Sequence, residues 1–221
     1  MEKNTIDADR LGPPLLSKLA VGRPPLIPVI HIEKASHSEP LLAALERGGI
    51  GMVEVTLRSS VALEVIERMR RASRGALIGA GTLTRPAHFE QATQAGAQFL
   101  VSPALTPELA KAAKTAALPF IPGVCTPTEA LLAREHGFLE QKFFPADLNG
   151  GINWIRHVYP LFPDVRFCPT GGISNANSKD FLGERNIFAV GGVYLAPRAM
   201  IESENWDEIA RIVADGIKSV M

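Results

Sequence analysis

Cysteine, net charge and long apolar runs are all scarce in this chain, and each shortage argues against a class of protein. Only two of the 221 residues are cysteine. Cys125 and Cys168 fall in or beside expected core strands, which indicates reduced thiols rather than a disulfide framework. The 23 basic and 23 acidic residues cancel, and no basic cluster predicts binding to nucleic acid or to an anionic membrane. No apolar run approaches the roughly 20 residues that cross a bilayer, and residues 1–10 lack the apolar core of a secretion signal. These features predict a soluble cytoplasmic protein.

What the chain does contain is a regular alternation of short apolar runs with amphipathic segments. The apolar runs are rich in β-branched residues, which is typical of buried strands. The expected strands are Leu26–Ile32, Met52–Leu57, Leu77–Gly81, Phe99–Ser102, Phe120–Val124, Lys142–Pro145, Arg166–Pro169 and Phe188–Val190. The expected helices are Pro40–Arg47, Ser60–Arg71, Pro86–Ala95, Pro107–Ala117, Pro127–His136, Ile152–Tyr159, Asn175–Leu182 and Trp206–Val220. A further helix over Ile6–Leu19 is expected within an N-terminal extension, residues 1–22.

The spacing of these segments predicts the fold class. Strands begin about every 20–25 residues, and βα alternation at that spacing favours a parallel sheet. Eight such units close into a (β/α)₈ TIM barrel. An open, doubly wound sheet is the competing fold, but no Gly-x-Gly-x-x-Gly motif follows the first strand. Because no linker divides the chain, we expect residues 1–221 to form one α/β barrel domain.

One lysine lies where a charged side chain is costly. Lys142 belongs to the apolar stretch QKFFP at 141–145, whereas the other lysines fall on helix faces, helix ends or loops. Burial favours the uncharged amine, which is able to attack a carbonyl group. Such an amine is what Schiff-base catalysis requires. The alternative is a strand-end lysine whose stem packs while its ammonium group reaches solvent.

A carboxylate is expected to face this lysine. Active sites of βα barrels lie at the carboxyl ends of the strands, and period-two alternation puts Glu54 and Thr56 on one face of theirs. Buried carboxylates need a partner or a task, so we expect Glu54 to project into the same barrel mouth as Lys142. Arg58 follows the strand and is placed to bind a carboxylate. The alternatives are a purely structural ion pair and a solvated arginine.

Two expected diglycine turns indicate a phosphate site. Gly171-Gly172 and Gly191-Gly192 follow the seventh and eighth expected strands, where barrels often bind phosphate. A helix capped by Ser174 or Asn175 would add free N–H groups to the first pair. Either pair alone could simply form a tight bend. The five histidines have no metal-site spacing, so the sequence predicts neither a metal nor another cofactor.

With these residues assembled, the chain resembles the 2-keto-3-deoxy-6-phosphogluconate (KDPG) and 4-hydroxy-2-oxoglutarate (KHG) aldolase family. The matching segments run in order across nearly the whole expected barrel. They are PLIPVI at 25–30, GGIGMVEVTLR at 48–58, IGAGT at 78–82, AGAQFLVSP at 95–103, PFIPGVCTPTEA at 119–130, KFFPA at 142–146, NGG at 149–151 and VRFCPTGGIS at 165–174. The resemblance implies a homotrimeric class I aldolase that needs no metal.

The resemblance also implies roles for individual residues. Lys142 matches the Schiff-base lysine, and Glu54 matches the acid/base. Arg58 and Thr82 match residues that hold the pyruvate carboxylate. The positions expected to contact the substrate are Arg58, Thr82, Pro103, Phe144, Gly171, Gly172, Gly191 and Gly192. The family has a serine after the second glycine pair, where this chain has Val193. The preference among KDPG, its galactonate epimer and KHG therefore stays open.

Together these features predict reversible cleavage of a 2-keto-4-hydroxy acid to pyruvate and an aldehyde. With KDPG the aldehyde is glyceraldehyde 3-phosphate, and with KHG it is glyoxylate. Two rival functions fit the same expected barrel. A phosphosugar epimerase or isomerase would normally need two carboxylates or histidines at one carbon and would be insensitive to borohydride. A non-catalytic barrel that binds a phosphorylated metabolite would be stabilised by its ligand without turnover.

Overall fold

Parallel strands form the centre of the molecule, in a computed structural model that describes residues 14–221. One sheet has six strands in the order β5-β4-β3-β2-β1-β9, and a second has three in the order β6-β7-β8. The strands are β1 (Leu26–Ile30), β2 (Met52–Thr56), β3 (Leu77–Gly81), β4 (Phe99–Val101), β5 (Phe120–Ile121), β6 (Gly123–Val124), β7 (Glu140–Phe143), β8 (Arg166–Pro169) and β9 (Val190–Gly192). Every strand pair within the two sheets is parallel, which confirms the predicted α/β class.

The two sheets meet at both of their edges. β5 and β6 are the halves of the expected strand Phe120–Val124, which is interrupted at Pro122. Proline has no N–H to donate to a ladder, but the Pro122 carbonyl still accepts a hydrogen bond from the Lys142 amide at 2.8 Å. On the other side, a parallel bridge between Thr170 and Gly191 links the end of β8 to β9.

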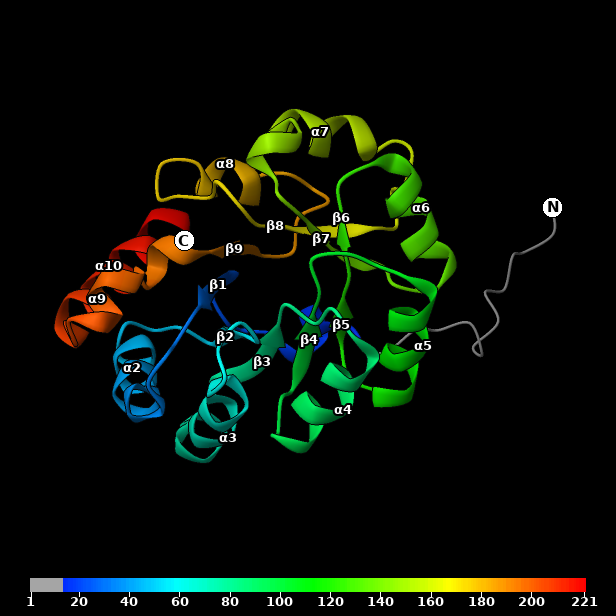
Figure 1. Cartoon of the computed structure of the whole chain (residues 1–221). Helices are drawn as coiled ribbons and strands as arrows, with labels where there is room; N and C mark the ends of the chain where they lie inside the picture. Colours follow the sequence, from blue (N-terminus) through cyan, green and yellow to red (C-terminus); the bar gives the residue numbers. More distant parts are fainter. Residues whose placement is uncertain (1–13) are drawn as a thin grey trace.

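Helices cover the outside of the strands (Figure 1). They are α1 (Leu16–Leu19), α2 (Ser38–Arg47), α3 (Ala62–Ala72), α4 (Pro86–Gln94), α5 (Pro107–Ala116), α6 (Pro127–Glu135), α7 (Gly151–Val158), α8 (Ser178–Leu182), α9 (Arg198–Glu202) and α10 (Trp206–Val220), with short 3₁₀ turns η2 (Ala35–His37), η3 (Asp147–Asn149) and η4 (Val193–Leu195). Local chemistry defines several starts. Thr126, for example, forms a reciprocal capping box with Glu129 and is followed by Pro127. α9 was not expected from the sequence pattern.

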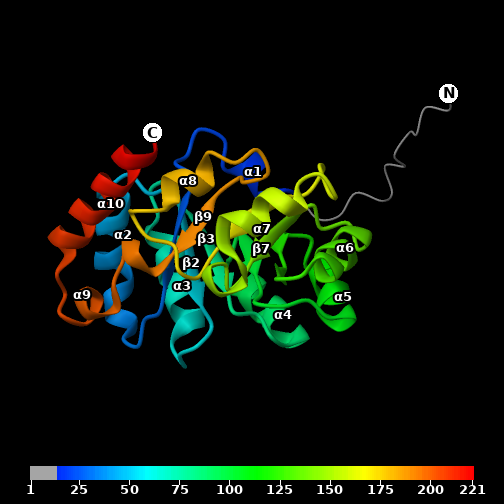
Figure 2. The ribbon, with the colours of Figure 1, turned by 90° about the horizontal axis from the view of Figure 1, so that it is seen from above.

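Apolar residues pack on both faces of the strands. Neighbouring residues alternate between two buried clusters: Leu26 belongs to the cluster shared with the outer helices, and Ile27 to the other. The second cluster comprises Leu16, Ile27, Met52, Leu77, Phe99, Val101, Ile121, Cys168 and Ala189. Leu16 is fully buried and comes from α1, which lies at one end of the strands (Figure 2). This short helix therefore closes the amino end of the inner core.

Of the helix expected over Ile6–Leu19, only the last turn is confirmed. Pro14 and Leu15 are not helical, so a helix continuous over Ile6–Leu19 is wrong in the described part, and α1 begins at Leu16. Leu15, which precedes α1, has an extended backbone with a φ of −77° and a ψ of 135°. Residues 1–13 of that expectation lie outside the described residues. Within residues 14–221, no helix combines the length and apolarity needed to span a membrane.

Candidate active site

A pocket of about 340 Å³ opens at the carboxyl ends of the strands. Its lining comes from segments that end or follow strands, which is where parallel βα units present functional groups. The lining residues are Val29, Glu54, Thr56, Arg58, Thr82, Pro103, Lys142, Phe144, Thr170, Gly171, Gly172, Ile173, Gly192 and Val193. The structure thus gathers every residue assigned from the sequence except Gly191.

Lys142 and Glu54 meet inside this pocket. Nζ of Lys142, on β7, donates a hydrogen bond of 3.2 Å to Oε1 of Glu54, on β2. The two side chains are only 8% and 4% exposed, so the lysine does not reach out to bulk solvent as the alternative reading required. The pair is the buried ion pair that the sequence left open. It lies in a cavity, however, where a small molecule can reach the amine.

Room for the Glu54 carboxylate depends on a glycine of the neighbouring strand. A Cβ on Gly81, the last residue of β3, would lie 2.1 Å from Oε1 of Glu54. Such a contact is impossible without displacement, so only glycine is compatible with the observed position of the carboxylate. The ladder between β2 and β3 brings Gly81 beside Thr56 and Gly79 beside Glu54. The backbone of β3 therefore helps to position the carboxylate.

A hydrogen-bond chain orients Arg58. Its Nε donates to Oγ1 of Thr56 at 3.2 Å, and the Thr56 hydroxyl donates to the carbonyl oxygen of Ile30 at 2.8 Å. Thr56 and Glu54 share one face of β2, as the alternation predicted, and Thr56 is buried. Its role as a support for Arg58 was not foreseen from the sequence. The planar guanidinium is held at the pocket wall, a geometry suited to a carboxylate ligand.

Strain is present at the end of β3. Thr82 has a φ of +64°, a left-handed conformation that is a genuine outlier for a β-branched residue. Such outliers cost on the order of 1–3 kcal/mol and cluster at functional sites. Pro103, across the pocket lining, packs directly against Gly123, where a Cβ would lie 2.1 Å from the proline carbonyl. Phe144 places its ring centroid 5.2 Å from Nζ of Lys142, within the range of a cation–π contact.

The two glycine pairs differ. Gly171 and Gly172 have φ values of +91° and +76° and form the expected turn at the pocket wall. Gly191 and Gly192, by contrast, belong to β9, whose expected span of Phe188–Val190 was placed too early, and Gly192 has extended backbone angles. The prediction of a second diglycine turn is therefore wrong. Gly191 faces the Thr170 side chain instead of the pocket, because a Cβ there would lie 2.5 Å from Oγ1 of Thr170.

The helix expected after Gly171-Gly172 also begins later than predicted. The cap is Asn177 rather than Ser174 or Asn175, and α8 starts at Ser178. The Asn177 side chain accepts a hydrogen bond from the Ser174 amide at 2.8 Å and donates to the Gly172 carbonyl at 2.9 Å. This local bonding replaces the first turn that the sequence pattern suggested. The diglycine turn is thus supported by the hydrogen bonds of the Asn177 side chain and not by the start of an adjoining helix.

Several lining residues were missed by sequence reasoning. Val29, Thr170 and Ile173 contribute to the pocket, although no individual role was assigned to them from the sequence. Period-two alternation on β1 could have found Val29, because its neighbours Pro28 and Ile30 point away from it. Thr170 and Ile173 flank the diglycine turn, and their placement depends on how that turn folds. Val193 had been noted only as a departure from the family pattern.

Charges in the pocket also act on Cys168. This residue lies opposite Lys142 in the ladder between β7 and β8. Burial raises the pKa of the thiol to about 12, the Lys142 ammonium opposes that rise, and the Glu54 carboxylate adds to it. Both cysteines are free, as expected, although Cys125 is only partly buried. Cys168 is therefore a neutral packing residue beneath the lysine.

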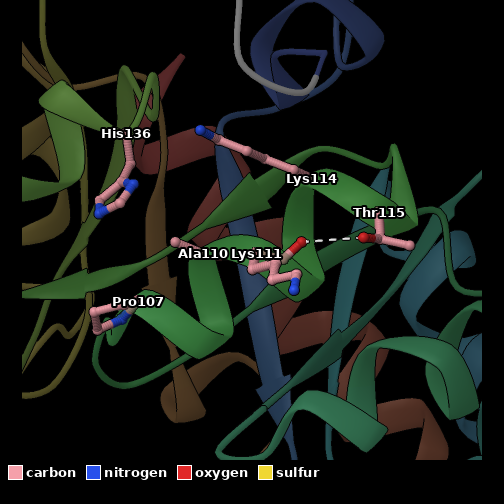
Figure 3. A pocket seen from close by; sticks show the side chains of 6 residues that line it. All are labelled: Pro107, Ala110, Lys111, Lys114, Thr115 and His136. Carbon is pink, nitrogen blue, oxygen red and sulfur yellow. Dashed lines mark hydrogen bonds between the residues drawn. The ribbon is translucent and has the colours of Figure 1, made fainter.

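A second hollow has no connection to this chemistry. Figure 3 shows it on the outer layer, between α5 and the end of α6. It is lined by Pro107, Ala110, Lys111, Lys114, Thr115 and His136. The only bond drawn there joins the Thr115 hydroxyl to the Lys111 carbonyl, a contact within α5. Neither Lys142 nor Glu54 contributes to it. Across residues 14–221, no three His, Cys, Asp or Glu side chains group as metal ligands.

Comparisons with known proteins agree with this geometry. The family model described as KDPG and KHG aldolase matches residues 18–212. A KHG/KDPG aldolase of Escherichia coli (strain K12) is 40% identical over 194 residues, or 88% of this chain and 91% of the relative. A 2-dehydro-3-deoxy-phosphogluconate aldolase of Dickeya dadantii is 41% identical over 193 residues, 87% of this chain and 91% of the relative. The crystal structure of KDPG aldolase from Legionella pneumophila, with pyruvate captured at low pH as a covalent carbinolamine intermediate, has a TM-score of 0.86 and 38% identity, covering 90% of this chain and 96% of that one.

Proposed function

The chain belongs to the KDPG and KHG aldolase family, and on that premise we propose that it cleaves KDPG to pyruvate and glyceraldehyde 3-phosphate through a Schiff base on Lys142. The same chemistry would cleave KHG to pyruvate and glyoxylate. The observation that carries the proposal is a buried lysine amine 3.2 Å from a buried carboxylate, inside a pocket large enough for a sugar acid. An epimerase would need a second acid or base, and Glu54 is the only carboxylate among the described lining residues.

The first step is addition of the amine to the ketone. Glu54 accepts the proton from the Lys142 ammonium across their hydrogen bond, which leaves a neutral nucleophile. Nζ then attacks C2 of the substrate and forms a carbinolamine. Loss of water, with a proton delivered to the departing hydroxyl, gives the protonated imine. In the relative from Legionella pneumophila, pyruvate was captured as such a carbinolamine.

The second step breaks the carbon–carbon bond. Glu54 removes the proton from the C4 hydroxyl, directly or through a water molecule. The C3–C4 electron pair then flows into the iminium, so that the aldehyde departs and an enamine remains. Glu54 returns the proton to C3, and water releases pyruvate from the resulting imine. Proton transfers of this kind contribute about 10²–10⁴-fold to a rate.

The remaining lining residues would hold the substrate. Arg58, oriented by Thr56, and Thr82 would bind the carboxylate beside C2 so that the ketone faces the amine. Phe144 and Pro103 would exclude water around the imine. Among residues 14–221, the amides of Gly171, Gly172 and Ile173 donate no hydrogen bond to another residue, so they would be available to a distal phosphate. Gly192 would complete that subsite, and Gly191 would support it by packing against Thr170.

We further propose that residues 1–221 form one domain, a closed (β/α)₈ barrel preceded by an extension over 1–22. The direct passage from β5 to β6 and the bridge between Thr170 and Gly191 support closure. Family membership supports a homotrimer, and the sequence composition supports a cytoplasmic location. The reaction as proposed needs no metal and no other cofactor, because the protonated imine is the electron sink.

Pyruvate release tests this proposal. The purified protein is incubated separately with KDPG, its galactonate epimer and KHG, and pyruvate is measured by coupled reduction to lactate. We expect release from KDPG in the wild type and none above background in Lys142→Arg. Thermal stabilisation by KDPG without any pyruvate release would support a binding protein and would contradict the proposal.

A further inference from the structure

One side of the pocket is apolar over three neighbouring strands. Ile173 follows β8, Val193 follows β9, and Val29 lies on β1, and all three line the pocket. β9 pairs with β1, and the bridge between Thr170 and Gly191 joins β9 to the end of β8. We call Val29, Ile173 and Val193 the apolar wall. Val193 is 60% exposed, so its isopropyl group stands in water at the pocket edge until a ligand covers it.

The charged groups flank this wall, since β2 pairs with β1 and β7 pairs with β8. Glu54 and Arg58 belong to β2 and the residues after it, and Lys142 belongs to β7. Lys142 is bonded to Glu54, and Arg58 is held by Thr56. No other lysine, arginine or histidine is among the described residues that line this pocket. Apart from Lys142 and Arg58, which the reacting end of the substrate engages, a distal group that lies against the apolar wall meets backbone amides and methyl groups and no cationic side chain.

We propose that the apolar wall gives this enzyme a second substrate class, the 2-keto-4-hydroxy acids whose C4 substituent is a short, uncharged alkyl group. In the reverse direction the enzyme joins pyruvate to the corresponding alkyl aldehyde. This inference rests on the proposed Schiff-base function, because the reacting end of the molecule is unchanged. Val193 is the residue that determines specificity, since it exposes the most apolar surface of the three.

The condensation balances without any added reagent. Lys142 and pyruvate form an imine with loss of one water, and Glu54 removes a proton from the methyl carbon to give the enamine. That carbon attacks the aldehyde, a C–C bond forms, and the aldehyde oxygen takes the proton from Glu54. One water then hydrolyses the imine and regenerates the amine. The alkyl chain takes no part in bond making, so it can differ freely if the wall accommodates it.

A matched pair of substrates isolates the contribution of the wall. 4-Hydroxy-2-oxohexanoate has the carbon skeleton of 2-keto-3-deoxygluconate but lacks the hydroxyl groups at C5 and C6. Covering the Val193 methyl groups favours the alkyl compound, whereas the hydroxylated one must give up hydrogen bonds to water there. One methylene in a hydrophobic pocket changes kcat/KM by roughly 10–200-fold. Because Val193 lies at the open edge, we expect the lower end of this range, about 10-fold, for Val193→Ser.

The experiment measures kcat/KM for both compounds and for KDPG in the wild type, Val193→Ser and Leu161→Ser. Leu161 is 59% exposed, close to the value for Val193, but does not line the pocket, so Leu161→Ser is the matched control. Lys142→Arg gives the background. We expect the wild type to prefer the alkyl compound, Val193→Ser to reduce that preference about 10-fold, and Leu161→Ser to leave it unchanged.

Two results would overturn the inference alone. One is release of pyruvate from KDPG with no release from 4-hydroxy-2-oxohexanoate above the Lys142→Arg background. The other is an unchanged preference in Val193→Ser, which would show that the wall does not select the substituent. If KDPG itself releases no pyruvate from the folded wild type, the proposed function fails, and this inference fails with it.

Discussion

The two ends of the strands differ in how they use their buried side chains. At the amino end, α1 inserts Leu16 into the inner core with no exposed area, and both carboxylate oxygens of the buried Glu140 accept a hydrogen bond from the Ser17 amide at 3.2 Å. At the carboxyl end, Lys142 and Glu54 form a buried pair beside a cavity, and Thr82 is strained. The amino end buries an apolar side chain and gives its carboxylate a backbone partner, whereas the carboxyl end places an ion pair beside a pocket and carries backbone strain.

This difference shows how one set of strands can separate stability from chemistry. Close packing and satisfied polar groups stabilise a fold, whereas a buried ionisable pair and a left-handed threonine cost free energy. Glu140 and Lys142 are two residues apart on β7, so a single strand carries a structural carboxylate at one end and the reactive amine at the other. Substitutions at the two ends should therefore affect different measurements.

The largest effect is expected for Lys142→Arg at the carboxyl end. Guanidinium stays protonated and cannot form an imine, so kcat should fall by at least about 10⁴-fold, in the range seen when a nucleophile is removed. Pyruvate release from KDPG measures the loss, and circular dichroism checks the fold. Retention of even a tenth of the activity would show that another group forms the intermediate.

Glu54→Gln should have the next largest effect. The amide keeps the shape of the carboxylate but cannot transfer the proton, so KDPG cleavage should slow by about 10²–10⁴-fold. Imine formation between pyruvate and Lys142 should slow, because the amide cannot take the ammonium proton, but long incubation with borohydride should still trap the adduct. Loss of trapping together with cleavage would instead assign Glu54 to activation of the amine alone.

At the amino end, Leu16→Ala should reverse this pattern. Removal of a fully buried leucine should lower the free energy of unfolding by about 2–5 kcal/mol, while kcat/KM for KDPG at 25 °C stays within about twofold of the wild type. Urea unfolding and steady-state kinetics on the same preparation measure both quantities. Leu161→Ala, at an exposed position, should change stability by no more than about 0.5 kcal/mol. A large loss of activity in folded Leu16→Ala would contradict the assignment of stability to the amino end and of chemistry to the carboxyl end.

Thr82→Gly should produce the smallest change, and the direction in which stability changes is the informative result. Glycine adopts a φ of +64° without strain, so the variant should gain about 1 kcal/mol of stability and melt about 2–4 °C higher. It should also lose the hydroxyl beside the carboxylate and show a higher KM. A lower melting temperature would mean that contacts of the Thr82 side chain outweigh its backbone strain.

Sequence reasoning located the chemistry better than the segment ends. The apolar alternation identified all of the sheet strands, and the positions of Lys142 and Glu54 followed from period-two geometry. It missed the start of β7, because Glu140 and Gln141 look polar. Glu140 accepts a hydrogen bond from the distant Ser17 amide, and the Gln141 side chain donates to the carbonyls of Ala130 and Phe138. Such partners are invisible to a local pattern.

The glycine-rich segments show the same limit. The turn at Gly171-Gly172 was foreseen from its residue type, but Gly191-Gly192 proved to be part of β9 because it pairs with β1. α8 starts late because the Asn177 side chain is hydrogen-bonded to Ser174 and Gly172 in the preceding loop. The left-handed Thr82 could not be predicted at all, since residue type argues against that conformation.

Reductive trapping tests the central claim most directly. The protein is incubated with pyruvate, reduced with sodium borohydride, digested and mapped by mass spectrometry. The account predicts one reduced three-carbon adduct, on the peptide that contains Lys142, and none in Lys142→Arg. An unmodified Lys142 peptide from active enzyme, or an adduct on a different lysine, would contradict it.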